Sequence, residues 1–178
     1  MKKVSRKLLL KIILVIISLV VFSVVVYKII SDNERVDVQL DSCVDGDTVW
    51  FIVDGKREKV RLLGIDTPES TNKIEEYGIL ASDYTCNILK NANYIYLEFD
   101  DNSDYRDKYN RLLAYVFVDG NNLSELLLSE GLAEVKYIYG DYKYIDRLCQ
   151  KQYEAYNNKL GIWNIYDYSK NYCYDKYF

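Results

Sequence analysis

Two Asp-Gly pairs, each standing between segments of alternating apolar and polar residues, constrain the fold of this chain more than any other feature. Asp45-Gly46 and Asp54-Gly55 separate three such segments. An Asp-Gly pair in this setting indicates a β-hairpin, because both residues tolerate the positive φ of the tight turns that join antiparallel strands. We therefore predict three antiparallel strands in meander order. Their apolar positions are Val36, Val38 and Leu40, then Val49, Phe51 and Val53, and finally Val60 and Leu62.

The rest of the domain alternates between helical and extended patterns. The predicted elements are a helix through Tyr77, Ala81, Tyr84 and Ile88, strands over residues 94–99 and 112–118, a short helix from Asn122 to Gly131, and a last helix over residues 142–159. The short helix begins at Asn122 because Asn122 and Glu125 stand at capping-box spacing. Five short strands and three helices predict a small α+β domain. Its strands can close into a five-stranded β-barrel of the oligonucleotide-binding type.

A long apolar run precedes this domain. Residues 12–27 are apolar apart from two serines and a terminal tyrosine, and extension to Ile30 gives 19 residues. About 20 residues cross a bilayer as a helix. Residues 1–31 hold six basic side chains and no acidic one, mostly before the run, so the N-terminus is expected to stay inside.

This pattern predicts a cytoplasmic basic segment (residues 1–11), a transmembrane signal-anchor (residues 12–30), a linker (residues 31–35) and an extracellular domain (residues 36–163) at the cell membrane. A cleaved signal peptide, which would release a secreted protein, is the main alternative. A buried core helix is a third reading, although the run has no polar face.

The four cysteines, Cys43, Cys86, Cys149 and Cys173, lie too far apart for a Cys-x-x-Cys metal or redox motif. Outside the membrane, disulfides are permitted. Three pairings are possible, and one of them, Cys149 with Cys173, would tie the C-terminal tail to the last helix. Isolated thiols are the alternative. The tail itself, residues 164–178, is rich in tyrosine and suggests no function.

The composition narrows the chemistry. The chain contains no histidine, which excludes the usual zinc sites and the nucleophile pairs that need an imidazole base. A hydrolase built on this sequence must use carboxylates, arginines or a hard metal ion. With 17 of the 23 basic residues and all 27 acidic ones, residues 32–178 have a formal net charge of −10. Such a domain repels a phosphate backbone, so its affinity for nucleic acid should be weak and strongly salt-dependent.

Three polar clusters interrupt the regular pattern, at residues 44–49, 61–69 and 107–111. The first has the composition of a hairpin turn. In the second, Asp66 and Glu69 flank Pro68, which restricts the backbone between them. Carboxylates and a carbonyl on rigid strand ends suit Ca²⁺ or Mg²⁺, which prefer oxygen ligands.

Two arginines extend this argument to a substrate. If Arg61 and Arg111 reach the point at which the carboxylates meet, and Asp47 supplies a further oxygen, the site combines a metal ion with two guanidinium groups. That combination matches the charge and geometry of the pentavalent state in phosphoryl transfer. The predicted substrate is therefore a phosphodiester.

In order and spacing, these residues resemble the thermonuclease family, also called micrococcal or staphylococcal nuclease. The resemblance extends from Val36 to Trp163. It is carried by Asp45-Gly46-Asp47-Thr48, Arg61-Leu62-Leu63, Asp66-Thr67-Pro68-Glu69, Tyr77-Gly78, Asp107-Lys108-Tyr109, Arg111, Leu113-Ala114-Tyr115, Gly131-Leu132-Ala133 and Gly161-Ile162-Trp163. Asn110 stands where the family usually has glycine, and Asn also accepts a left-handed backbone.

The resemblance implies an oligonucleotide-binding barrel with three helices and a Ca²⁺-dependent endonuclease that acts on DNA and RNA, leaving 3′-phosphate and 5′-hydroxyl ends. Asp47 and Asp66 would bind Ca²⁺ together with the Thr67 carbonyl. Glu69 would hold, and could deprotonate, the attacking water.

The resemblance also implies substrate contacts. Arg61 and Arg111 would grip the scissile phosphate. Lys108 and Tyr109 would contact a neighbouring phosphate, and Tyr137 and Tyr139 would form a wall on which a base stacks. No protein partner is implied, and we expect a monomer. A non-catalytic nucleic-acid-binding module on the same fold is the alternative, and an envelope protein that binds peptides or glycans through its tyrosines is a third class.

Overall fold

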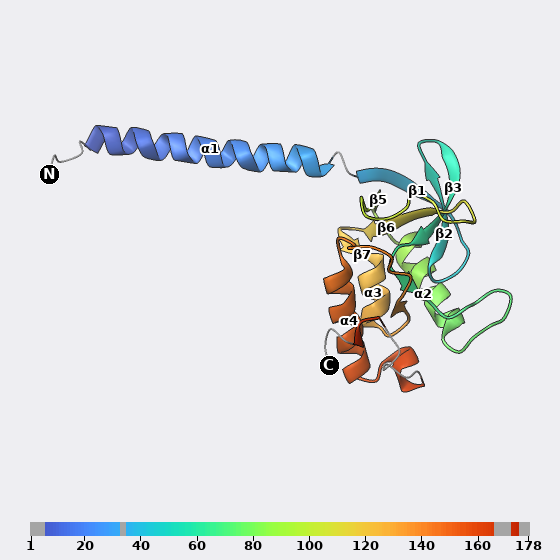
Figure 1. The fold of residues 1–178 in the computed structure, drawn as a ribbon. Coiled ribbons are helices and arrows are strands. Elements are labelled where there is room, and N and C mark those ends of the chain that lie inside the picture. Colours follow the sequence, from blue (N-terminus) through green and yellow to red (C-terminus); the bar gives the residue numbers. More distant parts are fainter. Residues whose placement is uncertain (1–5, 33–34, 166–171, 175–178) are drawn as a thin grey trace. The chain divides into compact units, whose positions relative to one another are not determined.

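The computed structural model describes residues 6–32, 35–165 and 172–174 (Figure 1). The chain divides into two compact units, one ending at Arg35 and the other beginning at Val36. Helix α1, Arg6–Asp32, belongs to the first unit, and its apolar side chains from Leu10 to Val24 are exposed. The helix predicted over residues 12–30 is thus present. Among the described residues, no helix combines the length and apolar character needed to cross a membrane.

The second unit is built on a closed barrel of five strands, as predicted. The strands are β1 (Arg35–Cys43), β2 (Thr48–Val53), β3 (Lys56–Leu62), β5 (Ile95–Glu98) and β6 (Leu112–Val118). Their order is β3-β2-β1-β5-β6, and a parallel pairing between β3 and β6 closes the barrel. Three two-residue strands were not predicted: β7 (Asn121–Asn122) extends the sheet beside β6, and β4 (Ile65–Asp66) pairs with β8 (Glu134–Val135).

The two Asp-Gly pairs form different connections. Asp54 and Gly55 join β2 to β3 as a two-residue turn with φ of 49° and 75°, the left-handed pair of values that a type I′ turn requires. Asp45 and Gly46 lie in a four-residue connection, in which the amides of Val44 and Asp45 both donate to the carbonyl of Thr48. The predicted meander is confirmed, but the first turn is wider than a tight hairpin.

Three helices accompany the barrel: α2 (Gly78–Lys90), α3 (Leu123–Ser129) and α4 (Ile145–Asn157), with a short 3₁₀ helix, η1 (Gly161–Asn164), near the end. Figure 1 shows α3 and α4 side by side. Two helices start later than predicted. Tyr77 precedes α2 with a left-handed backbone rather than lying within it, and α4 begins at Ile145 instead of Tyr142.

The N-terminus of α3 departs from the predicted capping box. The side chain of Asn122 accepts a hydrogen bond from the amide of Ser124 at 2.9 Å, as an N-cap should. Glu125 forms an ion pair with Arg147 of α4 at 2.9 Å, so its carboxylate serves helix packing. Gly131 follows the helix with φ of 67°, consistent with the predicted helix end.

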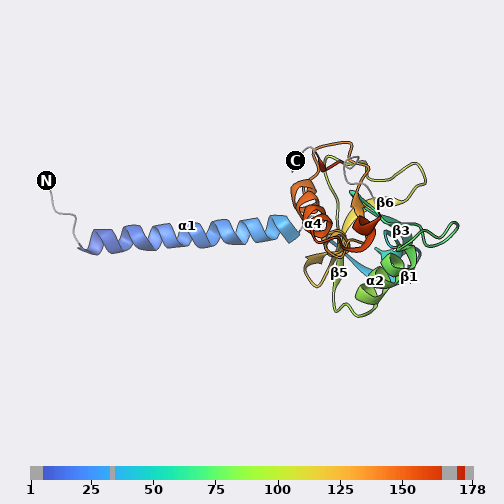
Figure 2. The ribbon, with the colours of Figure 1, turned by 90° about the horizontal axis from the view of Figure 1, so that it is seen from below.

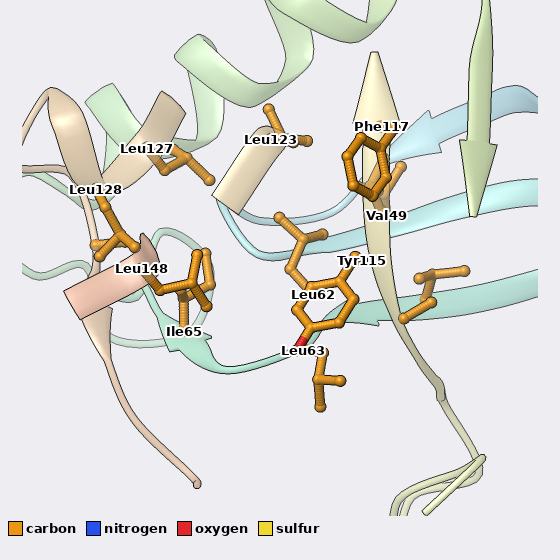
Figure 3. Close-up of a cluster of buried hydrophobic side chains, with 14 of the residues drawn as sticks. Val49, Leu62, Leu63, Ile65, Tyr115, Phe117, Leu123, Leu127, Leu128 and Leu148 are labelled. Carbon is orange, nitrogen blue, oxygen red and sulfur yellow. The ribbon is translucent and has the colours of Figure 1, made fainter. Parts of the chain in front are cut away.

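One hydrophobic core joins the barrel to the helices. Figure 3 shows barrel side chains such as Val49, Leu62 and Tyr115 in one cluster with Leu127 of α3 and Leu148 of α4. Each of these five side chains is at most 1% exposed. At roughly 25 cal/mol per Å² of apolar surface, such burial is the main favourable contribution to folding. The helices therefore complete the core of the barrel, and both depend on the same packing.

Two disulfides tie distant parts of the second unit together. Cys149 of α4 is bonded to Cys173, the pairing that ties the tail to the last helix. Cys43, at the end of β1, is bonded to Cys86 of α2. Seen from below, α2 lies beside β1 (Figure 2). The disulfide thus fixes α2 next to the connection that carries the first polar cluster.

Removing the Cys43–Cys86 disulfide should destabilise the domain measurably. Cys43 and Cys86 are 43 residues apart in the sequence, and Cys149 and Cys173 are 24 apart. By the loop-closure entropy of the unfolded chain, the two bonds stabilise the fold by about 4 and about 3.5 kcal/mol. We expect the Cys43→Ser, Cys86→Ser variant to unfold at lower urea concentration than the wild type. The Cys149→Ser, Cys173→Ser variant, which should lose slightly less stability by the same argument, serves as the comparison. An unchanged urea midpoint in the first variant would contradict the structural role of this bond.

Candidate active site

Asp47 forms the buried centre of the candidate site. Its side chain is 4% exposed and lies just before β2. Its Oδ2 accepts hydrogen bonds from the amide of Thr67 at 2.9 Å and from the Thr67 hydroxyl at 3.1 Å. Its Oδ1 accepts one from the Thr48 hydroxyl at 3.0 Å. Asp47 and Thr67 are 20 residues apart in the sequence. Hydrogen bonds to this carboxylate therefore hold the first and second polar clusters together.

Arg61 joins the two predicted metal-ligand carboxylates. It lies near the end of β3, opposite Thr48 of β2, and is 7% exposed. Its Nη1 is in ion-pair contact with Asp47 Oδ2, and its Nη2 lies 2.6 Å from Asp66 Oδ1. Two carboxylates thus hold this guanidinium in a fixed position near the end of β3.

Arg111 reaches the same cluster through a hydroxyl. Its Nη1 donates to Thr48 Oγ1 at 3.4 Å, and that hydroxyl donates to Asp47. Its Nε is held by Asp107 Oδ2 at 2.6 Å. Burial raises the pKa of Asp107, but bonds from the amide and guanidinium of Arg111 outweigh it and lower that pKa below its usual value. The ionised Asp107 therefore fixes Arg111 beside the barrel end, and Asn110 between them adopts the expected left-handed backbone, with φ of 62°.

Glu69 and Asp45 form a second pair of carboxyls with opposite pKa shifts. Bonds from the hydroxyl and the amide of Thr71 lower the pKa of Glu69. Burial raises the pKa of Asp45, and the charges of Asp47 and Glu69 add to this, against hydrogen bonds from Ser70 and the Gly46 amide. Two neighbouring carboxyls with divergent pKa values are a common arrangement for proton handling. The sequence predicts only a turn at Asp45, because an Asp followed by Gly is typical of turns.

Lys136 is a site residue that the sequence did not reveal. Its Nζ lies 3.0 Å from Asp66 Oδ2 and 2.7 Å from Glu134 Oε1. Burial lowers the pKa of Lys136, but the two carboxylates outweigh this effect and raise it. The short β4–β8 pair, in which Asp66 faces Glu134, brings this lysine to the cluster. A two-residue strand has no periodicity, so no sequence pattern could have located it.

Two of the four predicted substrate-binding residues, Tyr137 and Tyr109, lie beside the two arginines. The centre of the Tyr137 ring is 5.9 Å from the guanidinium carbon of Arg61. The centre of the Tyr109 ring is 5.4 Å from the guanidinium carbon of Arg111. Lys108 lies 5.0 Å from the Tyr109 ring. The exposed fractions are 50% for Tyr137, 69% for Tyr109 and 84% for Tyr139. Tyr109 and Tyr137 thus mark the open side of the arginine cluster, and Tyr139 is free to contact a ligand.

Helix α2 supports both acidic clusters from behind. The Thr85 hydroxyl donates to the carbonyl of Gly46 at 2.6 Å. A Cβ on Gly46 would lie 2.7 Å from the Thr67 hydroxyl oxygen, and a Cβ on Gly78 would lie 2.1 Å from the carbonyl oxygen of Glu69. Real Cβ atoms do not approach so closely. Glycine at these two positions therefore lets the helix pack directly against the backbone that presents Asp47 and Glu69.

The oxygen atoms of this cluster suit a hard cation. Asp47 and Asp66 contribute carboxylates, and the Thr67 carbonyl is a further oxygen donor; oxygen is the ligand that Ca²⁺ prefers. Both carboxylates already share one cationic group, the guanidinium of Arg61. Within the part of the chain that the structure describes, no group of three or more His, Cys, Asp or Glu side chains is arranged to hold a metal. The Glu69 carboxylate accepts hydrogen bonds from Thr71 and does not complete a group of three with Asp47 and Asp66.

Comparisons with known proteins agree with this arrangement. Residues 59–165 match the family described as staphylococcal nuclease homologue. Endonuclease YncB of Bacillus subtilis is 45% identical over 147 residues, covering 79% of this chain and 69% of that protein. The SPbeta prophage-derived endonuclease YokF of the same organism is 47% identical over 135 residues, covering 74% of this chain and 45% of that protein.

A third relative has a different source. The protein named thermonuclease from Staphylococcus hyicus is 39% identical over 124 residues, 68% of this chain and 72% of that protein. The family match covers more than half of the chain and includes Arg61, Asp66, Thr67, Glu69 and Arg111. Strands β5 and β6 and helices α2, α3 and α4 lie within the matched region, whereas β1, β2 and Asp47 precede it. The chain belongs to the staphylococcal nuclease homologue family.

Proposed function

We propose that this chain is a Ca²⁺-dependent endonuclease that hydrolyses phosphodiester bonds of DNA and RNA to 3′-phosphate and 5′-hydroxyl ends. The observation that carries the proposal is the position of Arg61, buried and ion-paired with both Asp47 and Asp66. Relatives named endonuclease and thermonuclease support it. The protein acts as a monomer on nucleic acid.

The residues divide the work between binding and chemistry. Arg61 and Arg111 bind the oxygens of the scissile phosphate and stabilise the charge that develops there. Glu69, kept ionised by its bonds to Thr71, orients the attacking water and can accept its proton. Asp47 and Asp66, with the Thr67 carbonyl, would hold Ca²⁺. A bound divalent cation supplies Lewis-acid stabilisation of the phosphate charge.

The exposed aromatic residues hold the strand. Tyr137 and Tyr139 provide rings on which a base stacks, and Lys108 and Tyr109 contact the phosphate next to the one that is cleaved. A non-catalytic module on the same fold remains the competing reading. The enzyme is favoured because a binding module has no need of the complete set, and all six positions are present: Asp47, Arg61, Asp66, Thr67, Glu69 and Arg111.

Chelation of the metal should abolish cleavage. The purified chain should degrade single- and double-stranded DNA when Ca²⁺ is present and lose this activity when a Ca²⁺ chelator is in excess, because the phosphate charge then lacks its cation. Mg²⁺ should substitute poorly. The measurement is release of acid-soluble nucleotides, with far-UV circular dichroism to show that the chelator leaves the fold intact. Cleavage that persists under chelation would overturn the metal assignment.

Replacing either arginine by lysine should reduce turnover far more than binding. Lysine keeps the charge but loses the planar two-point geometry of guanidinium. We expect Arg61→Lys and Arg111→Lys to lower kcat by about two to four orders of magnitude, or roughly 3–5 kcal/mol of barrier. Binding of an uncleavable oligonucleotide should weaken much less, since the lost interactions act mainly on the transition state.

Arg147→Lys is the matched control for this experiment. Arg147 contacts Glu125 and the ring of Tyr144, neither of which is assigned to the phosphate. Its replacement should leave kcat unchanged. If both Arg61→Lys and Arg111→Lys cleave as fast as the control, the active site has been placed wrongly even though the family is correct.

The proposed location is the outer side of the cell membrane, with the domain attached through residues 12–30 or secreted after their removal. Two features support it. Basic side chains precede an apolar run whose described side chains are exposed, and two disulfides tie the second unit together, which is typical of an oxidising compartment.

Protease treatment of intact cells tests this location. An added protease should remove the domain while leaving the basic residues 1–11 protected, because they would lie inside the cell. Detection of the domain in the medium, with a new N-terminus near Val24, would instead indicate a cleaved signal peptide. A domain that stays protected until the cells are lysed would contradict both forms of the proposal.

A further inference from the structure

Strand β3 carries basic side chains at every second position from the candidate active site toward the Asp54-Gly55 turn. Arg61, Lys59 and Arg57 alternate with other residues, so they share one face of the strand. On the neighbouring strand β2, Trp50 pairs with Lys59. Of the intervening residues, Val60 is fully buried and Glu58 pairs with Arg106. Arg57 and Lys59 therefore lie on the outer face of β3, in line with Arg61, which is itself buried at the site.

Two of these basic groups pack against the tryptophan. The guanidinium carbon of Arg57 is 4.0 Å from the centre of the Trp50 ring, and Nζ of Lys59 is 4.9 Å from it. Arg57 is held in place by Asp41, 2.8 Å from its Nε, and by the Ser42 hydroxyl at 3.2 Å. Lys59 has no carboxylate partner among the residues that the structure describes. The cluster thus combines a fixed flat surface with an uncompensated positive charge.

This surface is unusual for the domain that carries it. Residues 32–178 have a formal net charge of −10, yet Arg57 and Lys59 continue the line of the buried Arg61 along one face of β3. Adjacent members of this line are two residues apart, or about 7 Å along a strand. Nucleic acid presents a charge about every 3.4 Å along one strand, so Arg61 to Arg57 corresponds to about four stacked nucleotides. Indole rings and guanidinium planes are both surfaces on which bases stack.

We propose that Trp50, Arg57 and Lys59 form a second nucleic-acid contact surface, which binds the single strand beyond the nucleotides held at the active site. The inference rests on the proposed nuclease function and specifies how a longer substrate is held. A strand whose scissile phosphate lies at Arg61 would continue along β3, with phosphates near Lys59 and a base against the Trp50–Arg57 surface. The surface raises affinity for long strands and takes no part in the chemical step.

Substrates of two lengths separate this surface from the active site. The purified full chain would be tested for binding to single-stranded DNA of about 12 nucleotides with uncleavable linkages, a length within the site sizes of oligonucleotide-binding folds. Cleavage of a dinucleotide, too short to reach Trp50, would report on the active site alone. The variants are Trp50→Leu, Trp50→Phe and Lys59→Gln, with Lys151→Gln on α4 as the charge-matched control.

We expect Trp50→Leu to weaken binding of the long strand by about fivefold or more, the loss of one stacked base, and Trp50→Phe to retain most of the affinity. Lys59→Gln should reduce the slope of log affinity against log salt by about 0.7, as for one phosphate contact on a single strand. Dinucleotide cleavage should be unchanged in all variants. The control should match the wild type in both assays.

Several outcomes would overturn the inference. If Trp50→Leu and Lys59→Gln bind the long strand as the wild type does, the cluster only stabilises the β2–β3 hairpin. If they lose dinucleotide cleavage in parallel with binding, the substitutions disturb the active site and no separate surface exists. A wild-type chain that cleaves neither the dinucleotide nor an unmodified strand of the same length as the binding probe would contradict the proposed function itself, and that result is distinguishable from both of the others.

Discussion

The contact of one buried guanidinium with two carboxylates is the interaction around which the site is organised. Arg61 is 7% exposed and Asp47 is 4% exposed, so both charges have lost most of their hydration. In such a pair the attraction between the charges roughly offsets the cost of desolvation, and the contact therefore contributes little to folding. The favourable free energy of folding comes instead from the apolar core that joins the barrel to α3 and α4. A buried charge cluster that adds so little to stability is better explained by chemistry than by folding.

Geometry at this cluster depends on helix α2, which touches none of the reacting groups. The helix holds the carbonyl of Gly46 through Thr85, is bonded covalently to the end of β1, and packs at Gly78 against the backbone of Glu69. These contacts fix the two loops that carry Asp47 and Glu69 relative to each other. Preorganised charges need no reorganisation when the transition state forms, which is where much of their catalytic value arises.

Features that depend on local sequence could be predicted, and features that depend on distant contacts could not. The five barrel strands and three helices follow from periodicity and turn residues, and Asn110 has the left-handed backbone expected of it. The wide first turn reflects the bonds of Asp47 to Thr67, 20 residues away. Lys136 reaches Asp66 through a pair of two-residue strands. Residue type alone makes Asp66 a candidate metal ligand and Arg61 a candidate phosphate ligand, and the resemblance to a family gives them a common site, since their chemistry does not specify where they meet.

The negative net charge of the domain affects the binding of substrate more than the rate of its cleavage. At physiological ionic strength a charge is screened over about 8 Å, so carboxylates on distant faces act only weakly at the scissile phosphate. What a bound phosphate experiences is the local set of three cations, Arg61, Arg111 and Lys136, which pair with four carboxylates, those of Asp47, Asp66, Asp107 and Glu134. Any cation bound between the carboxylates shifts that balance toward positive charge. A net charge of −10 therefore lowers affinity for strands far from the site, while the stabilisation of the transition state is determined within a few ångströms of Arg61.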